Sequence, residues 1–230
     1  QYHISRFLKQ SIQTANWEWL NELLVLKAKF ADYGGKIYPN GNVLDGDLDI
    51  SRGRGLFFAT PQYIKLCYWA ENRVGEEEFK VEFPRFMERL MQEYPLDTLM
   101  KAEKDRVIDE IRKEGQTEFL KSFARGILKR GELTTPRIVE WTDYFWKLSP
   151  SDEKTKESCR EWVLYAFNAN RLYGETAFYV ADFLARIGYF EDAKTVLEQA
   201  IYLQKDIRSD NKALMKELEW KLRDVNNRKL

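Results

Sequence analysis

The strongest structural signal in the chain lies in residues 177–203, AFYVADFLARIGYFEDAKTVLEQAIYL. Apolar residues recur there at the helical spacing of three and four on both sides of Gly188. The first stripe consists of Phe178, Val180, Ala181, Phe183, Leu184 and Ile187, and the second of Ala193, Val196, Leu197, Ala200 and Ile201. The pattern predicts two short helices joined at Gly188, where the turn is expected to permit little side-chain bulk and to need a positive φ.

Small residues stand where these two helices must face each other, which allows a close approach. They are Ala181, Gly188, Ala193 and Ala200. Together with Leu184 and Leu197, they resemble the small, large and glycine positions of one tetratricopeptide repeat of roughly 34 residues. The resemblance implies an all-α protein stacked as antiparallel hairpins in a right-handed superhelix, and apolar periodicity along the chain predicts about nine helices.

Apolar periodicity outside this hairpin predicts helices along most of the chain. Residues 1–30 are expected to form one long helix that ends at Gly34 and Gly35. Further helices are expected from Pro61 to Arg73, from Phe83 to Tyr94 with Pro84 in the first turn, and over residues 97–111, 116–130, 135–148, 149–167 and 211–227. Ser149 is expected to cap the helix over residues 149–167, with Pro150 as the first helical residue and Asp152 as a capping-box acid. Two regions follow: residues 1–75, with a long Gly- and Asp-rich loop, and the hairpin region 76–230, continuous with the first.

The balance of charge excludes one broad class of function. Thirty-seven basic residues match thirty-seven acidic residues, so the chain lacks the positive field of a general nucleic-acid binder. No run of about 18 apolar residues is present, and no transmembrane segment is expected. The chain begins with Gln1. A soluble protein is expected, either cytoplasmic or secreted after removal of a signal, and the sequence predicts no oligomeric state.

Cysteine and histidine usage argues against several kinds of catalytic site. Cys67 and Cys159 are far apart and belong to no metal-ligand pattern, so we predict two buried free thiols. The only histidine, His3, lies in the first turn of the chain. A Ser-His-Asp triad or a multi-histidine zinc site is therefore excluded, and no cofactor is expected.

The longest irregular stretch, residues 32–55, is the first candidate for a site outside the hairpin. Its alternating carboxylates, the weak metal-ligand candidates, are Asp45, Asp47 and Asp49. An EF-hand would need glycine and glutamate where Ile50 and Leu56 stand, so a solvated acidic turn is favoured over a calcium site. Arg52 and Arg54 lie beside glycines, but no Gly-Lys-Ser/Thr follows to complete a phosphate-binding loop.

The preferred function is a non-catalytic scaffold or adaptor that binds a protein or peptide. In a stack of hairpins, the first helix of each pair lines a concave groove. The tentative partner-binding residues are Glu175, Tyr179, Asp182 and Arg186, which the core stripe leaves over, and Arg52 and Arg54 of the loop.

Two alternatives remain open. The first is a hydrolase or a sugar-modifying enzyme, in which one of the three loop aspartates acts as acid, base or ligand and a loop arginine holds an anion. The second is a structural helical segment of a larger assembly.

Overall fold

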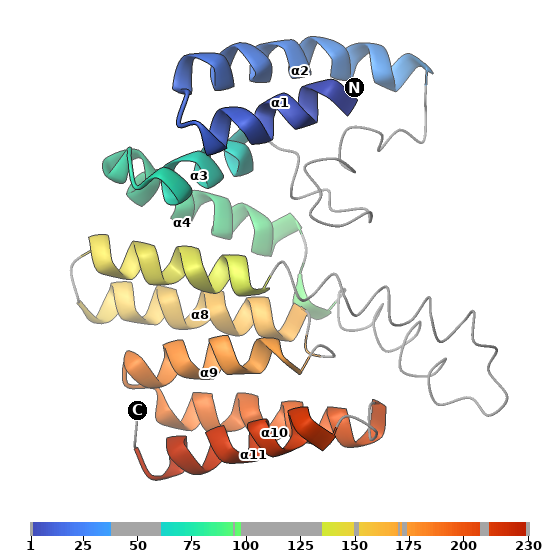
Figure 1. Cartoon of the computed structure of the whole chain (residues 1–230). Helices are drawn as coiled ribbons and strands as arrows, with labels where there is room; N and C mark the ends of the chain where they lie inside the picture. The colour runs from blue at the N-terminus through green and yellow to red at the C-terminus, as the bar shows by residue number, and fades with distance from the viewer. Residues whose placement is uncertain are drawn as a thin grey trace, which may run out of the picture. The chain divides into compact units, whose positions relative to one another are not determined.

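The computed structural model describes residues 2–37, 61–93, 95–97, 135–149, 152–169, 171, 174–207 and 212–228. These residues form nine helices of eleven residues or more and no strand, and more than half of the 230 residues are helical. The described part of the chain is therefore all-α, as predicted (Figure 1). The predicted loop residues Asp45, Asp47, Asp49, Arg52 and Arg54 lie outside the described residues, and so does the helix expected at residues 116–130.

The chain divides into two compact units, Gln1–Leu90 and Met91–Leu230. The sequence patterns placed the change of region at residue 75. The N-terminal unit contains α1 (Tyr2–Gln13), α2 (Trp17–Ile37), α3 (Pro61–Asn72) and most of α4 (Glu76–Glu93). Its core is rich in aromatic rings, because Trp17 lies 5.0 Å from Tyr68 and 5.8 Å from Trp69, centroid to centroid.

The single long helix expected at the N-terminus is wrong, because the chain breaks between α1 and α2. Ala15 adopts a left-handed φ of 51°, and the amide of Asn16 donates to the carbonyl of Ser11 at 2.9 Å. These features form a Schellman motif, which ends a helix. Tyr68 of α3 donates its hydroxyl to the carbonyl of Ala15 at 2.7 Å, so a tertiary contact supports the break.

Two other helix ends differ from the sequence prediction. Gly34 and Gly35 lie inside α2, which continues to Ile37. Pro84 lies in the interior of α4, because this helix starts earlier, directly after Gly75, whose carbonyl accepts from the amide of Phe79 at 2.8 Å. Three glutamates fill the first turn of α4, where the helix dipole favours negative charge.

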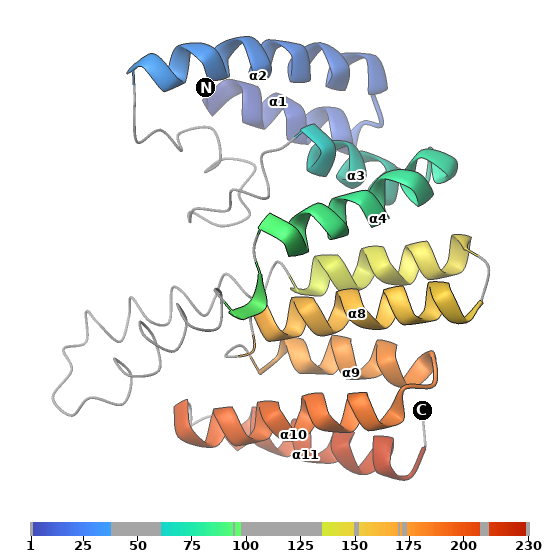
Figure 2. The ribbon, with the colours of Figure 1, turned by 180° about the vertical axis from the view of Figure 1, so that it is seen from behind.

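The C-terminal unit contains five described helices that lie side by side in chain order (Figures 1 and 2). The first covers residues 135–148, and the others are α8 (Glu153–Ala169), α9 (Thr176–Arg186), α10 (Phe190–Ile207) and α11 (Lys212–Asn226). Thr135 and Pro136, where the sequence predicts the start of this helix, are its first described residues. The hydroxyl of Thr135 donates to the carbonyl of Ala166 at 2.9 Å, which joins this start to α8.

The predicted hairpin is present as α9 and α10, joined at Gly188. Every residue of the two predicted stripes except Phe178 is buried, and Val180, Ala181, Leu184, Ala193, Val196, Leu197 and Ala200 are each at most 2% exposed. Gly188 has a φ of +95°, and the amide of Tyr189 donates to the carbonyl of Leu184 at 2.8 Å. This is again a Schellman end, here with glycine at the left-handed position.

The expectation that Gly188 leaves little room for a side chain is wrong. A Cβ atom built at this position would meet only the flexible end of Lys156, at 3.8 Å. The backbone conformation, and not crowding, is therefore what requires glycine there.

An ion-paired cluster joins α8 to the start of α10 beside this turn. Arg160 donates two hydrogen bonds to the carboxylate of Asp192, at 2.6 and 3.0 Å. Tyr189 donates its hydroxyl to Glu157 at 2.8 Å. Burial and this hydrogen bond raise the pKa of Tyr189 to about 12. The bidentate geometry makes the cluster a specific link between the two helices.

The cap of α8 also differs from the prediction, because Asp152 and not Ser149 performs that role. The amide of Thr155 donates to Oδ1 of Asp152 at 2.7 Å, directly before the first helical residue, Glu153. This hydrogen bond lowers the pKa of Asp152. The prediction of two buried cysteines outside any disulfide is confirmed, since Cys67 and Cys159 are both buried and neither forms a disulfide.

Candidate functional site

A groove of about 570 Å³ opens on the C-terminal unit, and we call it the C-terminal groove. Alternate helices line it: residues 135–148, α9 and α11 contribute to its wall. The lining residues are Pro136, Val139, Glu140, Asp143, Phe178, Tyr179, Asp182, Arg186, Trp220 and Lys221. The groove therefore combines residues from three helices that are distant in sequence.

The periodicity of α9 explains which of its residues reach the groove. Tyr179, Asp182 and Arg186 are spaced by three and four and lie on one helix face, whereas the opposite stripe is buried in the core. These three predicted residues all line the C-terminal groove. Glu175 does not line it, and instead lies at the position before α9, where its side chain makes no capping hydrogen bond.

Phe178 corrects the predicted core stripe. The sequence placed this ring in the core, but it is only partly buried and lines the groove beside Tyr179. Its position follows from helix geometry, because residue 178 is next to the groove-facing residue 182 on the helix surface.

A chain of ion pairs holds the three lining helices together. Arg186 donates from Nη1 to Oδ1 of Asp143 at 2.7 Å, and its Nε lies 3.6 Å from Oδ2 of Asp182. Lys221 of α11 donates to Oδ1 of Asp182 at 2.6 Å. Lys147 donates to the other oxygen of Asp143 at 2.6 Å. Each carboxylate therefore bridges two cations.

The titration of Asp143 reflects this chain of ion pairs. Partial burial alone would raise its pKa, but the hydrogen bonds from Lys147 and Arg186, together with their charges, outweigh burial and lower the pKa. Asp143 is therefore ionised at neutral pH and is poorly suited to act as a general acid there. Burial, and then the charge of Asp143, raises the pKa of the nearby Cys159 thiol to about 12, which makes it a weak nucleophile.

Two large aromatic side chains on the groove wall are unusually exposed. Tyr179 is 56% exposed and Trp220 is 58% exposed. Exposed tyrosine and tryptophan residues on a concave surface are typical of the energetic centres of protein interfaces. The groove therefore combines an aromatic wall with an ion-paired wall.

Sequence reasoning identified only the α9 part of this groove. Glu140, Asp143, Trp220 and Lys221 were not among the predicted site residues. The sequence carried no comparable signal for Trp220, because single exposed apolar residues are normal on protein surfaces.

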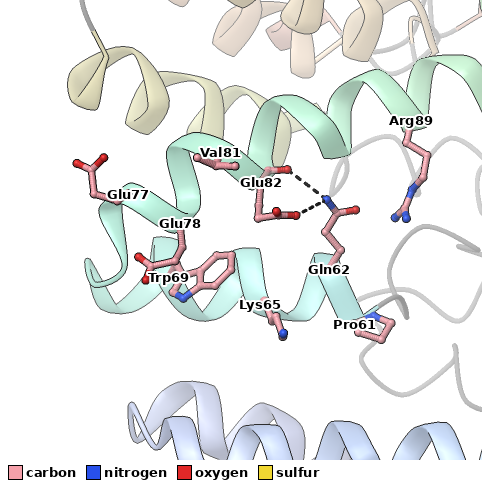
Figure 3. Close-up of a pocket in the computed structure, with 9 residues that line it drawn as sticks. All are labelled: Pro61, Gln62, Lys65, Trp69, Glu77, Glu78, Val81, Glu82 and Arg89. Carbon is pink, nitrogen blue, oxygen red and sulfur yellow. Dashed lines mark hydrogen bonds between the residues drawn. The ribbon is translucent and has the colours of Figure 1, made fainter.

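A second cavity, which we call the α3–α4 groove, lies within the N-terminal unit and measures about 770 Å³ (Figure 3). It is lined by Pro61, Gln62, Lys65, Trp69, Glu77, Glu78, Val81, Glu82 and Arg89. Gln62 of α3 donates to the backbone carbonyl of Glu82 at 3.3 Å and to its carboxylate at 3.0 Å, so a polar bridge connects the two helices (Figure 3).

The α3–α4 groove is larger, but its chemistry is less suited to binding. Its aromatic residue, Trp69, is only 7% exposed and belongs to the core. Lys65 points away from α4 (Figure 3), and its ammonium lies 5.8 Å from the centre of the Trp17 ring. We therefore take the C-terminal groove as the candidate site.

Two kinds of feature are absent from the described part of the chain. No three His, Cys, Asp or Glu side chains are grouped there as metal ligands would be. None of its helices is both long enough and apolar enough to cross a membrane.

Comparisons with protein-family models, curated proteins and solved structures found no match for the chain. The site is therefore interpreted from its own geometry.

Proposed function

We propose that the C-terminal unit is a peptide-binding module of the tetratricopeptide-like kind, and that the protein acts as a scaffold or adaptor. The observation that carries this proposal is the C-terminal groove, with two aromatic side chains more than half exposed on a wall built from alternate helices. In stacked helical hairpins, alternate helices form the concave, ligand-binding surface.

The construction of the groove supports a rigid binding surface. The ion pairs of Asp143 and Asp182 join residues 135–148, α9 and α11 to one another. A surface that is already ordered loses little conformational entropy when a ligand binds. A groove of this volume accommodates a few side chains of an extended peptide or a helix.

The residue chemistry supports binding in preference to catalysis. The two aspartates in the groove, Asp143 and Asp182, are paired with cations at 2.6 to 2.7 Å, and the lowered pKa of Asp143 keeps that carboxylate ionised. Aromatic contacts to a partner contribute affinity without any proton transfer.

The test is a selection of random dodecapeptides displayed on phage against the full chain, followed by fluorescence anisotropy. We expect selected peptides to bind wild type and to lose roughly tenfold or more in affinity with Tyr179→Ala plus Trp220→Ala, because such anchors contribute on the order of 2 kcal/mol or more. The matched control is Tyr202→Ala on α10, which removes a tyrosine that is 66% exposed and outside the groove. Peptides that bind the double variant as tightly as wild type would refute the proposal.

A further inference from the structure

We propose that the occupant of the C-terminal groove is a peptide segment with an arginine or lysine side chain that lies against Tyr179 and Trp220 and pairs with Glu140 or Asp182. This assignment depends on the proposed function, and it specifies the charge of the ligand.

The cations of the groove are already neutralised. Arg186 donates to Asp143 at 2.7 Å, and Lys221 donates to Asp182 at 2.6 Å while only 15% exposed. An acidic ligand residue would have to displace Asp182 from Lys221, or share Arg186 with Asp143 and Asp182, whose negative charges would repel it. The displaced carboxylate would then lose a charge-assisted hydrogen bond.

Two carboxylates of the groove, Glu140 and Asp182, are exposed and can accept a further hydrogen bond from a ligand. Glu140 is 55% exposed, and its ion pair with Arg137 is long, at 3.7 Å. Asp182 is 48% exposed although it faces two cations. A carboxylate can accept about four hydrogen bonds, so Asp182 can accept one from a ligand and keep Lys221.

The aromatic wall favours the same charge. Within the described residues, neither Tyr179 nor Trp220 makes a ring contact, a hydrogen bond or a contact with a cation. A cation above the face of such a ring is attracted by the ring quadrupole. The planar guanidinium of arginine also stacks on aromatic faces, so arginine should bind better than lysine.

The experiment uses three phage libraries of random dodecapeptides that differ only in a fixed central residue: arginine, glutamine or glutamate. Each library is selected against the full chain, and the affinities of the recovered peptides are measured by fluorescence anisotropy at low and high salt. The measurements are repeated with Tyr179→Ala plus Trp220→Ala, with Glu140→Lys, and with Glu198→Lys on the exposed face of α10 as the charge control. Circular dichroism verifies the fold of each variant.

We expect the arginine library to supply the tightest peptides. Their affinity should fall roughly fivefold or more with Glu140→Lys, as for loss of an exposed ion pair with added repulsion, and remain unchanged with Glu198→Lys. Added salt should weaken their binding.

Three results would overturn the inference. If the glutamate library supplies the tightest peptides and the aromatic double variant abolishes their binding, the ligand is acidic and only the proposed function survives. If no library yields a peptide that depends on the groove, both proposals fail. If wild type sediments as a dimer and the double variant as a monomer, the occupant is a second copy of the chain.

Discussion

Replacing Gly188 by alanine tests how the hairpin is held together. At a φ of +95°, a side chain costs about 1–2 kcal/mol. The added Cβ would meet only the end of Lys156, at 3.8 Å, so no steric cost is added. Alanine also has less conformational freedom than glycine in the unfolded chain, which offsets about 0.4–1 kcal/mol of this cost. We expect a net destabilisation of about 1 kcal/mol.

The assay is urea unfolding followed by the helical circular dichroism signal. With a slope of about 1–3 kcal/mol per molar urea, the midpoint should fall by about 0.3–1 M. Gly188→Leu should cost nearly the same as Gly188→Ala, because both share the strain of the positive φ and the atoms nearest the Cβ belong to the flexible end of Lys156. Gly188→Asn should cost less, since asparagine tolerates the left-handed region.

The reverse substitution at the α1 end is the matched control. Ala15 occupies the same position of a Schellman motif, with a φ of 51°, so Ala15→Gly should relieve strain and not destabilise the protein. A leucine at position 188 that costs far more than alanine, or an asparagine that costs as much, would refute the reasoning from backbone strain.

Two further perturbations follow from the same structure. Gly75→Ala should destabilise by about 2–5 kcal/mol, the sum of left-handed strain and overpacking, because its Cβ would lie 2.5 Å from Cδ1 of Trp69; a urea midpoint shift worth under 1 kcal/mol would contradict this. The pKa of Asp143 is lowered by folding, so its stabilising contribution is present above the unfolded value of about 3.9 and is lost as the pH falls through the folded value. The stability of Asp143→Asn should therefore fall less steeply than that of wild type as the pH drops below about 4. Urea midpoints that depend on pH in the same way in both proteins would show that Asp143 makes no such contribution.

The hairpin of α9 and α10 could be predicted because its signals are local. The helical spacing of its apolar residues places them on one face of each helix, and Gly188 marks a position that other residues occupy only with strain. The break at Ala15 has only a weaker local signal, Asn16, whose side chain caps α2 by accepting from the amide of Trp19 at 2.9 Å. It depends on hydrogen bonds from Tyr68 to Ala15 and from Asn72 to Ile12, at 2.7 and 2.9 Å, and both donors come from α3.

The α9 face of the candidate site was also determined by the sequence itself, because Tyr179, Asp182 and Arg186 are the residues that the core stripe leaves over. Which residues oppose that face was decided only by the tertiary structure. Asp143 is 43 positions from Arg186, and Lys221 is 39 positions from Asp182. Helical periodicity relates residues within a few turns of one helix, whereas the packing of residues 135–148, α9 and α11 brings these distant charges within hydrogen-bonding distance.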